Sequence, residues 1–313
     1  MLFAVRRIAA IAFNTYREAV RARILLGLFA LALATALYSI AVGEFALKNA
    51  SRVVADLGAA SISIYAILVA VVIGATSLYR ELEQKTIFPI LARPLKRAEY
   101  LVGKYAGTLL TIAVFIALDA AAVLLILARH GGRSWATIGA TVAALLIVPA
   151  ILGYYLPRWR TYLPIGWAMV AMSVAIILSS GAADDRRVVL GASSLALMEV
   201  MIVSALATLF SSFSSPFLSA VFTVGLFIVG REAGTLGRLP VRVFGEGLKR
   251  AGAVLATLVP NLEVYVPPRL LLTGEALNVS LGRHLALAGV QAVAWSVGLM
   301  VVSSLIFERR DLS

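Results

Sequence analysis

Long apolar runs separated by short charged segments dominate the chain. Eight runs carry few or no charged residues: 24–43, 57–79, 105–128, 135–156, 162–180, 188–210, 216–230 and 285–307. About 20 apolar residues in a helix are enough to cross the hydrocarbon core of a bilayer. We therefore predict an all-α, polytopic transmembrane helical bundle of about eight spans. Prolines interrupt 135–156 and 162–180, and 216–230 is shorter than the others.

Two local patterns predict contacts between these spans. Pro149 falls inside 135–156, and a proline within a span is tolerated when a neighbouring helix satisfies the carbonyl that it frees. Gly103 and Gly107 have the four-residue spacing of closely packed transmembrane helices. We interpret both glycines as packing positions.

Two segments, one before the first apolar run and one before the last, do not have the composition of a span. Residues 3–22 place apolar side chains at helical spacing with Arg17, Glu18 and Arg21 between them. This pattern predicts an amphipathic helix in the cytoplasmic interface, or equally an extension of the first span. Segment 231–284 alternates glycine, arginine and apolar residues, and its apolar run 251–259 is too short to cross a membrane. It predicts a re-entrant or external surface-lying helix.

The orientation follows from the basic residues in the short loops. With the N-terminus inside, the cytoplasmic segments hold slightly more than half of the 28 Lys and Arg residues. Many of the remainder lie in 231–284, and long segments obey the positive-inside rule poorly. We expect both termini to be cytoplasmic, as an even number of spans requires. Trp135 and Tyr154 lie at opposite ends of one run, as in an interfacial aromatic belt.

Composition narrows the class of protein. The chain is 61% hydrophobic and 14% charged, with a mean hydropathy of +0.95, which indicates lipid as its solvent. Its net charge of +12 is explained by basic loops facing anionic lipid, so we expect no nucleic-acid partner. Cysteine is absent, and His130 and His284 stand far apart, so we expect no metal site. The sequence has no G-x-x-x-x-G-K-[ST] motif or common hydrolase motif, so we expect no catalytic residues.

The stretch from Tyr79 to Tyr105, YRELEQKTIFPILARPLKRAEYLVGKY, is dense in charges of both signs. Glu81 and Lys85 have the favourable order for an ion pair four residues apart on a helix. Pro89 and Pro94 interrupt the chain before a new helix enters the membrane. The pattern predicts a short helical hairpin on the cytoplasmic face, suited to binding a soluble partner.

This stretch resembles the first cytoplasmic loop of ABC-2 type transporter permeases, in which a glutamate-rich helix leads to a Leu-x-x-Pro-x-x-Arg turn. The matching residues are Glu81, Glu83, Thr86, Leu91, Pro94, Arg97, Tyr100, Gly103 and Lys104. Three later stretches are similar to the same family: Ser211 to Pro216, Val259-Pro260-Asn261-Leu262-Glu263, and Ile306 to Leu312. The resemblance covers the chain in the family's order. It is nearest to the nitrous-oxide-reductase maturation and sodium-export subgroup.

The resemblance implies a fold and a role. The fold is a six-span core, to which the insertion 130–187 adds the helical pair 135–180. The role is that of a permease, a multi-pass exporter subunit of a bacterial or archaeal cytoplasmic (inner) membrane. Partners are separate ABC ATPase subunits, which bind ATP and Mg, a second permease copy or homologue, membrane lipid, and in some systems a periplasmic accessory protein. The loop 80–104 would contact the ATPase through Arg80, Glu81, Glu83, Lys85, Thr86, Arg93, Pro94, Arg97 and Lys104.

Two acidic residues lie deep inside predicted spans, Asp119 in 105–128 and Glu199 in 188–210. Ionisable groups are costly in lipid, so both should face protein or water. They either line a translocation pathway or anchor neighbouring helices by hydrogen bonds. An alternative class of function, an ion-coupled secondary transporter, would use both residues for coupling. An intramembrane enzyme is a third class, but no polar catalytic cluster is recognisable.

Overall fold

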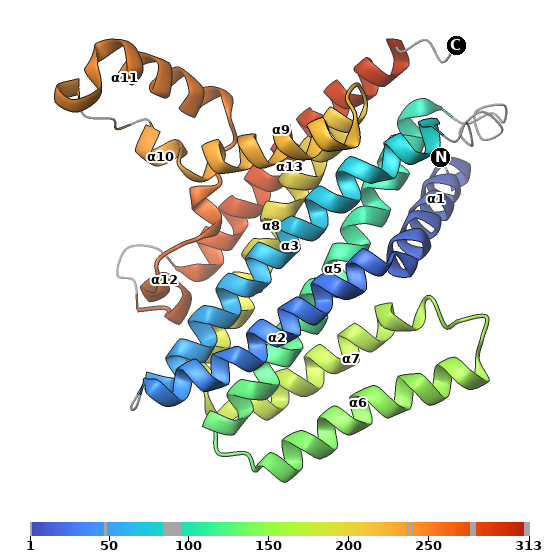
Figure 1. The fold of residues 1–313 in the computed structure, drawn as a ribbon, viewed down its shortest axis with the longest axis vertical. Helices are drawn as coiled ribbons and strands as arrows, with labels where there is room; N and C mark the ends of the chain where they lie inside the picture. Colours follow the sequence, from blue (N-terminus) through green and yellow to red (C-terminus); the bar gives the residue numbers. More distant parts are fainter. Residues whose placement is uncertain are drawn as a thin grey trace.

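A computed structural model describes residues 2–46, 49–83, 96–236, 238, 241–275 and 280–309. All regular secondary structure in these residues is helical (Figure 1), which confirms the predicted all-α class. Seven helices, by length and composition, are apolar enough to cross a membrane. The α-helices are α1 (Leu2–Arg21), α2 (Arg23–Phe45), α3 (Ala50–Glu83), α5 (Arg97–His130), α6 (Trp135–Tyr155), α7 (Leu163–Leu178), α8 (Ala183–Ser211), α9 (Pro216–Arg231), α10 (Ala233–Leu236), α11 (Val241–Leu258), α12 (Arg269–Thr273) and α13 (Leu281–Arg309).

Seven of the eight predicted runs therefore correspond to long helices. The eighth, 216–230, forms the 16-residue helix α9, which is about 24 Å long and shorter than the hydrocarbon core. Whether this part of the chain crosses the membrane stays a prediction. Both ends of the predicted loop 80–104 belong to neighbouring helices, because α3 continues to Glu83 and α5 already begins at Arg97. Residues 84–95 lie outside the described residues.

The helices run between two ends of the bundle, and both termini lie at the same end (Figure 1). At this first end Arg97 of α5 donates hydrogen bonds to the carbonyls of Phe307 and Glu308 in the last turns of α13. The α6–α7 connection lies there too, because Tyr162 stacks on Tyr16 of α1. At the second end, the guanidinium of Arg269 in α12 binds the carboxylates of Asp56 and Asp185, near the starts of α3 and α8.

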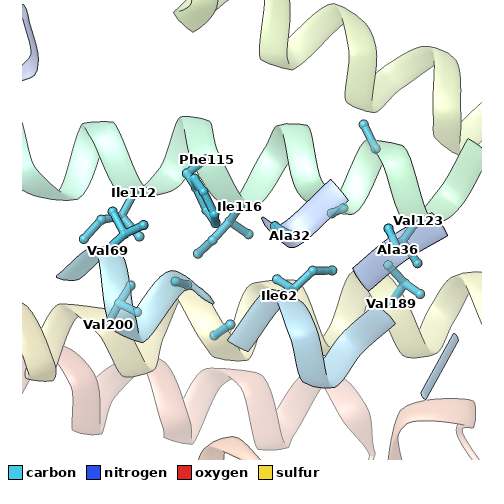
Figure 2. Close-up of a cluster of buried hydrophobic side chains, with 14 of the residues drawn as sticks. Ala32, Ala36, Ile62, Val69, Ile112, Phe115, Ile116, Val123, Val189 and Val200 are labelled. Atoms are coloured by element: carbon cyan, nitrogen blue, oxygen red, sulfur yellow. The ribbon is translucent and has the colours of Figure 1, made fainter. Parts of the chain in front are cut away.

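The core lies between α3, α5 and α8, with α2 packed on one side (Figure 2). It is built from aliphatic side chains and from alanines such as Ala32 and Ala36, which allow close approach of α2. Lipid chains are as apolar as these side chains, so close van der Waals packing, rather than removal from water, holds such helices together. Small residues at the contacts serve this packing.

Gly103 and Gly107 bring α1 against α5, as their spacing predicts. A Cβ atom on Gly103 would lie 2.7 Å from Cβ of Ile11, and one on Gly107 would lie 2.4 Å from the carbonyl oxygen of Ala12. Both distances are shorter than van der Waals contact allows, so only glycine fits this contact. The helix predicted at 3–22 is α1, and its orientation relative to a membrane stays a prediction.

Helices α6 and α7, the predicted extra pair at 135–180, meet through a proline and a tryptophan. Pro149 lies inside α6 and has no N–H to donate to the carbonyl of Leu145, four residues earlier. The indole Nε1 of Trp167 in α7 donates to that carbonyl oxygen at 2.8 Å. A neighbouring helix thus satisfies the acceptor that the proline leaves open, as a low-dielectric membrane requires.

Between α9 and α13 the chain leaves the bundle and returns. The amide of Leu262 donates to the carbonyl of Gly230 at 2.9 Å, so the two ends of segment 231–261 meet. Helix α11, which breaks its helical conformation at Gly245, projects away from the bundle within this excursion (Figure 1). The predicted short apolar run 251–259 thus lies, except for its last residue, in an 18-residue helix that ends at Leu258.

After the excursion, the chain continues toward the second end in largely non-helical conformation. Side chains of α13 satisfy its backbone: Gln291 donates to the carbonyl of Asn261, and a ring nitrogen of His284 lies 2.9 Å from the carbonyl oxygen of Val264. Tyr265 in turn donates to the carbonyl of Ala288. Non-helical backbone at membrane depth requires such protein partners. Together, α9 and this stretch extend from one end of the bundle to the other.

The chain has no cysteine, so single introduced thiols can report the topology. We expect Lys96→Cys and Arg160→Cys to react with a membrane-impermeant maleimide only from the cytoplasmic side, and Arg133→Cys only from the opposite side. The reason is that the exposed positions 96 and 160 lie at the first end and 133 lies at the second. Labelling of Lys96→Cys and Arg133→Cys from the same side would contradict the topology.

The bond between Trp167 and Leu145 can be tested by a double-mutant cycle. Trp167→Phe should lower the free energy of unfolding in mixed micelles by about 1 kcal/mol, because the carbonyl of Leu145 loses its donor. In a Pro149→Ala background, residue 149 regains an N–H that can serve this carbonyl. The same Trp167→Phe change should then cost measurably less, and an equal cost in both backgrounds would contradict the assignment.

Candidate functional site

A buried ion pair joins α8 and α9 midway along the bundle. Glu199 lies in the middle of α8, and Arg231 is the last residue of α9. Arg231 donates from Nε to Oε1 of Glu199 at 2.7 Å and from Nη2 to Oε2 at 2.8 Å. Ser63 of α3 donates to Oε2 and accepts from Nη2, which ties a third helix to the pair. The arrangement is a two-pronged, charge-assisted contact, the strongest form of this pairing.

Burial makes the two partners depend on each other. The side chain of Glu199 is 1% exposed, and that of Arg231 is 25% exposed. An isolated charge in this environment would be strongly unfavourable, so removing one partner should cost far more than the pair itself contributes. The guanidinium also lies 5.3 Å from the ring centre of Phe227, one turn earlier in α9. The end of α9 is therefore fixed at the middle of the bundle.

A cavity of about 610 Å³ adjoins this pair, between α3, α9 and the returning chain. Its apolar wall includes Ile67, Val71 and Phe227, and its polar wall includes Arg231 and Glu263. The size is that of a pocket for a small organic molecule. Arg231 forms part of the cavity wall, so a molecule in the cavity would contact the cation of the ion pair at the end of α9.

Asp119 is buried apart from this cluster. Its side chain is fully buried in α5, and neither carboxylate oxygen has a hydrogen-bond partner among the described residues. No hydrogen bond or ion pair connects it with Glu199 within the described part of the chain. The two acidic residues that the sequence singles out are thus separate: Glu199 anchors three helices, whereas Asp119 is an unpaired polar group in the core.

The predicted ATPase-contacting residues fall into three groups. Lys85, Thr86, Arg93 and Pro94 lie outside the described residues, and Arg80, Glu81 and Glu83 form the last turn of α3. Arg97 binds the end of α13, with its guanidinium 5.9 Å from the ring centre of Phe307. Lys104 is 4% exposed and lies over the ring of Tyr100, so its side chain faces the bundle.

Two residues important to these arrangements were not identified from the sequence. The sequence pattern assigns Arg231 to the external segment 231–284. The signal for the pair is a single arginine at the end of a short apolar run, together with a single glutamate inside the preceding span. Glu99 of α5 binds Arg7 of α1 at 3.2 Å and links the N-terminal helix to the loop. Among the described residues, no group of three or more His, Asp or Glu side chains could hold one metal ion.

Comparison with models of known protein families and with curated proteins finds no match to this chain.

The ion pair makes a prediction about stability. Glu199→Gln should lower the free energy of unfolding in mixed micelles by roughly 2–4 kcal/mol, because Arg231 keeps its charge and loses its partner. The double variant Glu199→Gln/Arg231→Gln should lose less than the sum of the two single changes, by about 1–3 kcal/mol.

The chain contains a matched control for this cycle. Glu246 and Arg250 form an ion pair at 2.9 Å on α11, but their side chains are 71% and 80% exposed. The same glutamine substitutions there should change stability by about 0.5 kcal/mol or less. Equal effects at the two pairs would contradict a structural role for burial at Glu199 and Arg231.

Proposed function

We propose that the chain is the membrane-spanning permease subunit of an ABC-2 type transporter and acts in export. The observation that carries this proposal is the mixed-charge segment between α3 and α5, with its resemblance to the ATPase-binding loop of that family. The sequence has no nucleotide-binding motif, so ATP would be hydrolysed by a separate ATPase subunit. A second permease copy or homologue would complete the membrane part.

The surroundings of this segment suit the transmission of force. The segment is attached directly to two 34-residue helices, α3 and α5, each about 51 Å long. Near its end, Arg97 holds α13 and Glu99 holds α1. A partner that displaces the segment would therefore move four helices together. Such coupling requires that the partner contact the two states of the bundle differently.

The cavity beside Arg231 supports the translocation step, in which movement of the helices opens a path for the substrate. It lies between α3, which bears the first residues of the charged segment, and α9, whose last residue is held by the ion pair with Glu199. A shift of α3 would move Ser63 relative to Glu199 and Arg231 and so change the shape of the cavity. We infer that ATP-driven rocking of α3 and α5 opens and closes this space between the two sides of the membrane.

Asp119 favours a second candidate function, that of an ion-coupled secondary transporter. A buried carboxyl group without a hydrogen-bond partner among the described residues is typical of proton-binding sites in transporters. This function would require Asp119 for transport and no ATPase partner. Asp119→Asn, which preserves the size of the side chain, would abolish transport by such a protein and would leave an ATP-driven permease active.

Co-purification tests the primary proposal. A tagged chain, solubilised from its native membrane, should bring down a protein that contains a Walker A motif, identified by mass spectrometry. The double reversal Glu81→Lys/Glu83→Lys should lower the recovered ATPase at least about tenfold, because it places positive charge where the partner meets negative charge.

The double variant Asp184→Lys/Glu275→Lys provides the matched control, since it reverses the same number of acidic charges on exposed residues near the second end. It should leave the recovery of the ATPase unchanged. The absence of any ATPase from the wild-type preparation, or equal losses for the two reversals, would overturn the proposal.

A further inference from the structure

A concave site lies at the second end of the bundle, far from the charged segment. It has a volume of about 440 Å³ and forms where α2 ends, α3 begins, α5 ends and α6 begins. Its lining combines three ionisable side chains, Glu44, Arg129 and His130, with Ile40, Ile126 and Trp135. Gly132, with a φ of +90°, makes the tight turn that brings Trp135 back beside α5.

The charged side chains of this site are available for a ligand. The carboxylate of Glu44 and the ring of His130 have no hydrogen bond or ion pair with any described residue. The guanidinium of Arg129 lies 5.9 Å from the ring centre of Trp135, a cation–π contact that leaves its N–H groups open. A positive and a negative group thus face one concave space without neutralising each other. This pattern fits a ligand that carries both an anionic and a cationic group.

Helix α6 presents an exposed apolar surface next to the charged groups of the site. Leu146, Ile147 and Val148 are 67%, 55% and 40% exposed, and consecutive residues point about 100° apart around a helix. Exposed apolar side chains thus cover more than half of the circumference of α6, and the less exposed Ile138, Leu145 and Pro149 lie along the remaining side. In the described part of α6 only Ile138 is buried. In a bilayer such apolar surfaces are covered by acyl chains, and Ile40 and Ile126 continue this apolar surface into the site.

We propose that this site binds a phospholipid whose headgroup carries a phosphate and a primary ammonium, as in phosphatidylethanolamine. Arg129 and His130 bind the phosphate, since guanidinium and imidazole N–H groups match its oxygens. Glu44 accepts hydrogen bonds from the ammonium group, and the acyl chains lie along the exposed apolar surface of α6. Trp135 stands at the level of the glycerol backbone, the usual depth of interfacial tryptophan. This inference is independent of the proposed transport function.

Phosphatidylethanolamine and phosphatidylglycerol differ in the ammonium group, which only the former carries and which Glu44 would bind. Phosphatidylglycerol supplies the same phosphate to Arg129 but offers no cation to Glu44, so its net negative charge meets an unpaired carboxylate. The preference for phosphatidylethanolamine should reach about fivefold, the size of one partly exposed ion pair. Arg129 should be needed for both lipids, whereas Glu44 should be needed only for the preference.

Native mass spectrometry of the full chain in detergent measures these affinities with dioleoyl forms of the two lipids. Glu44→Gln should weaken binding of phosphatidylethanolamine to the level of phosphatidylglycerol, which stays unchanged. Arg129→Gln should weaken the binding of both. Asp184→Asn and Arg133→Gln, which change exposed charges at the same end outside the site, should leave both affinities as in the wild type.

A soluble competitor separates a lipid site from a site for a free phosphate compound. Glycerophosphoethanolamine has the same headgroup without acyl chains, so it should not displace the lipid at equal concentration. Displacement by it would overturn the lipid assignment. Equal affinities of the wild type for the two lipids, or a preference that survives Glu44→Gln, would overturn the proposal as a whole. Gel filtration and thermal unfolding of each variant confirm that a lost preference does not reflect a misfolded protein.

Discussion

A charge buried halfway along a helical bundle must be neutralised where it lies, and Glu199 and Arg231 neutralise each other. This contact determines where α9 ends. A 16-residue helix is too short to reach the second end of the bundle, so its last residue is left in the interior. The ion pair and Ser63 make that interior position stable, and the chain can then continue without a helix.

Backbone carbonyl groups inside the bundle likewise need hydrogen-bond partners where they lie. The returning segment after Pro260 has carbonyls that no helix satisfies, and side chains of α13 bind them. In α6 the carbonyl freed by Pro149 binds the indole of Trp167. These two departures from regular helix are thus matched by donors on neighbouring helices. The irregular parts of the bundle are consequently fixed by specific pairs of residues, whereas the regular parts are held by many small packing contacts.

The helices could be predicted from the sequence because the apolar residues that form one span follow one another in the chain. It also identified Gly103 and Gly107 as packing positions, since a spacing of four residues is a local feature. It missed Arg231 because the partner, Glu199, is 32 residues away and only the fold places the two charges together. Lys104 was placed on a surface hairpin for the same reason: the sequence does not tell which side of α5 faces the bundle. The roles of Arg80, Glu81 and Glu83 stay predictions.

The excursion between Gly230 and Leu262 begins and ends at one hydrogen bond. Because its two ends already meet, residues can be added to or removed from it without changing the distance that the chain must span. This is the place where related proteins can diverge most in length while the bundle stays the same. It is also a suitable position at which to insert a fluorescent domain or an epitope for imaging the assembled protein.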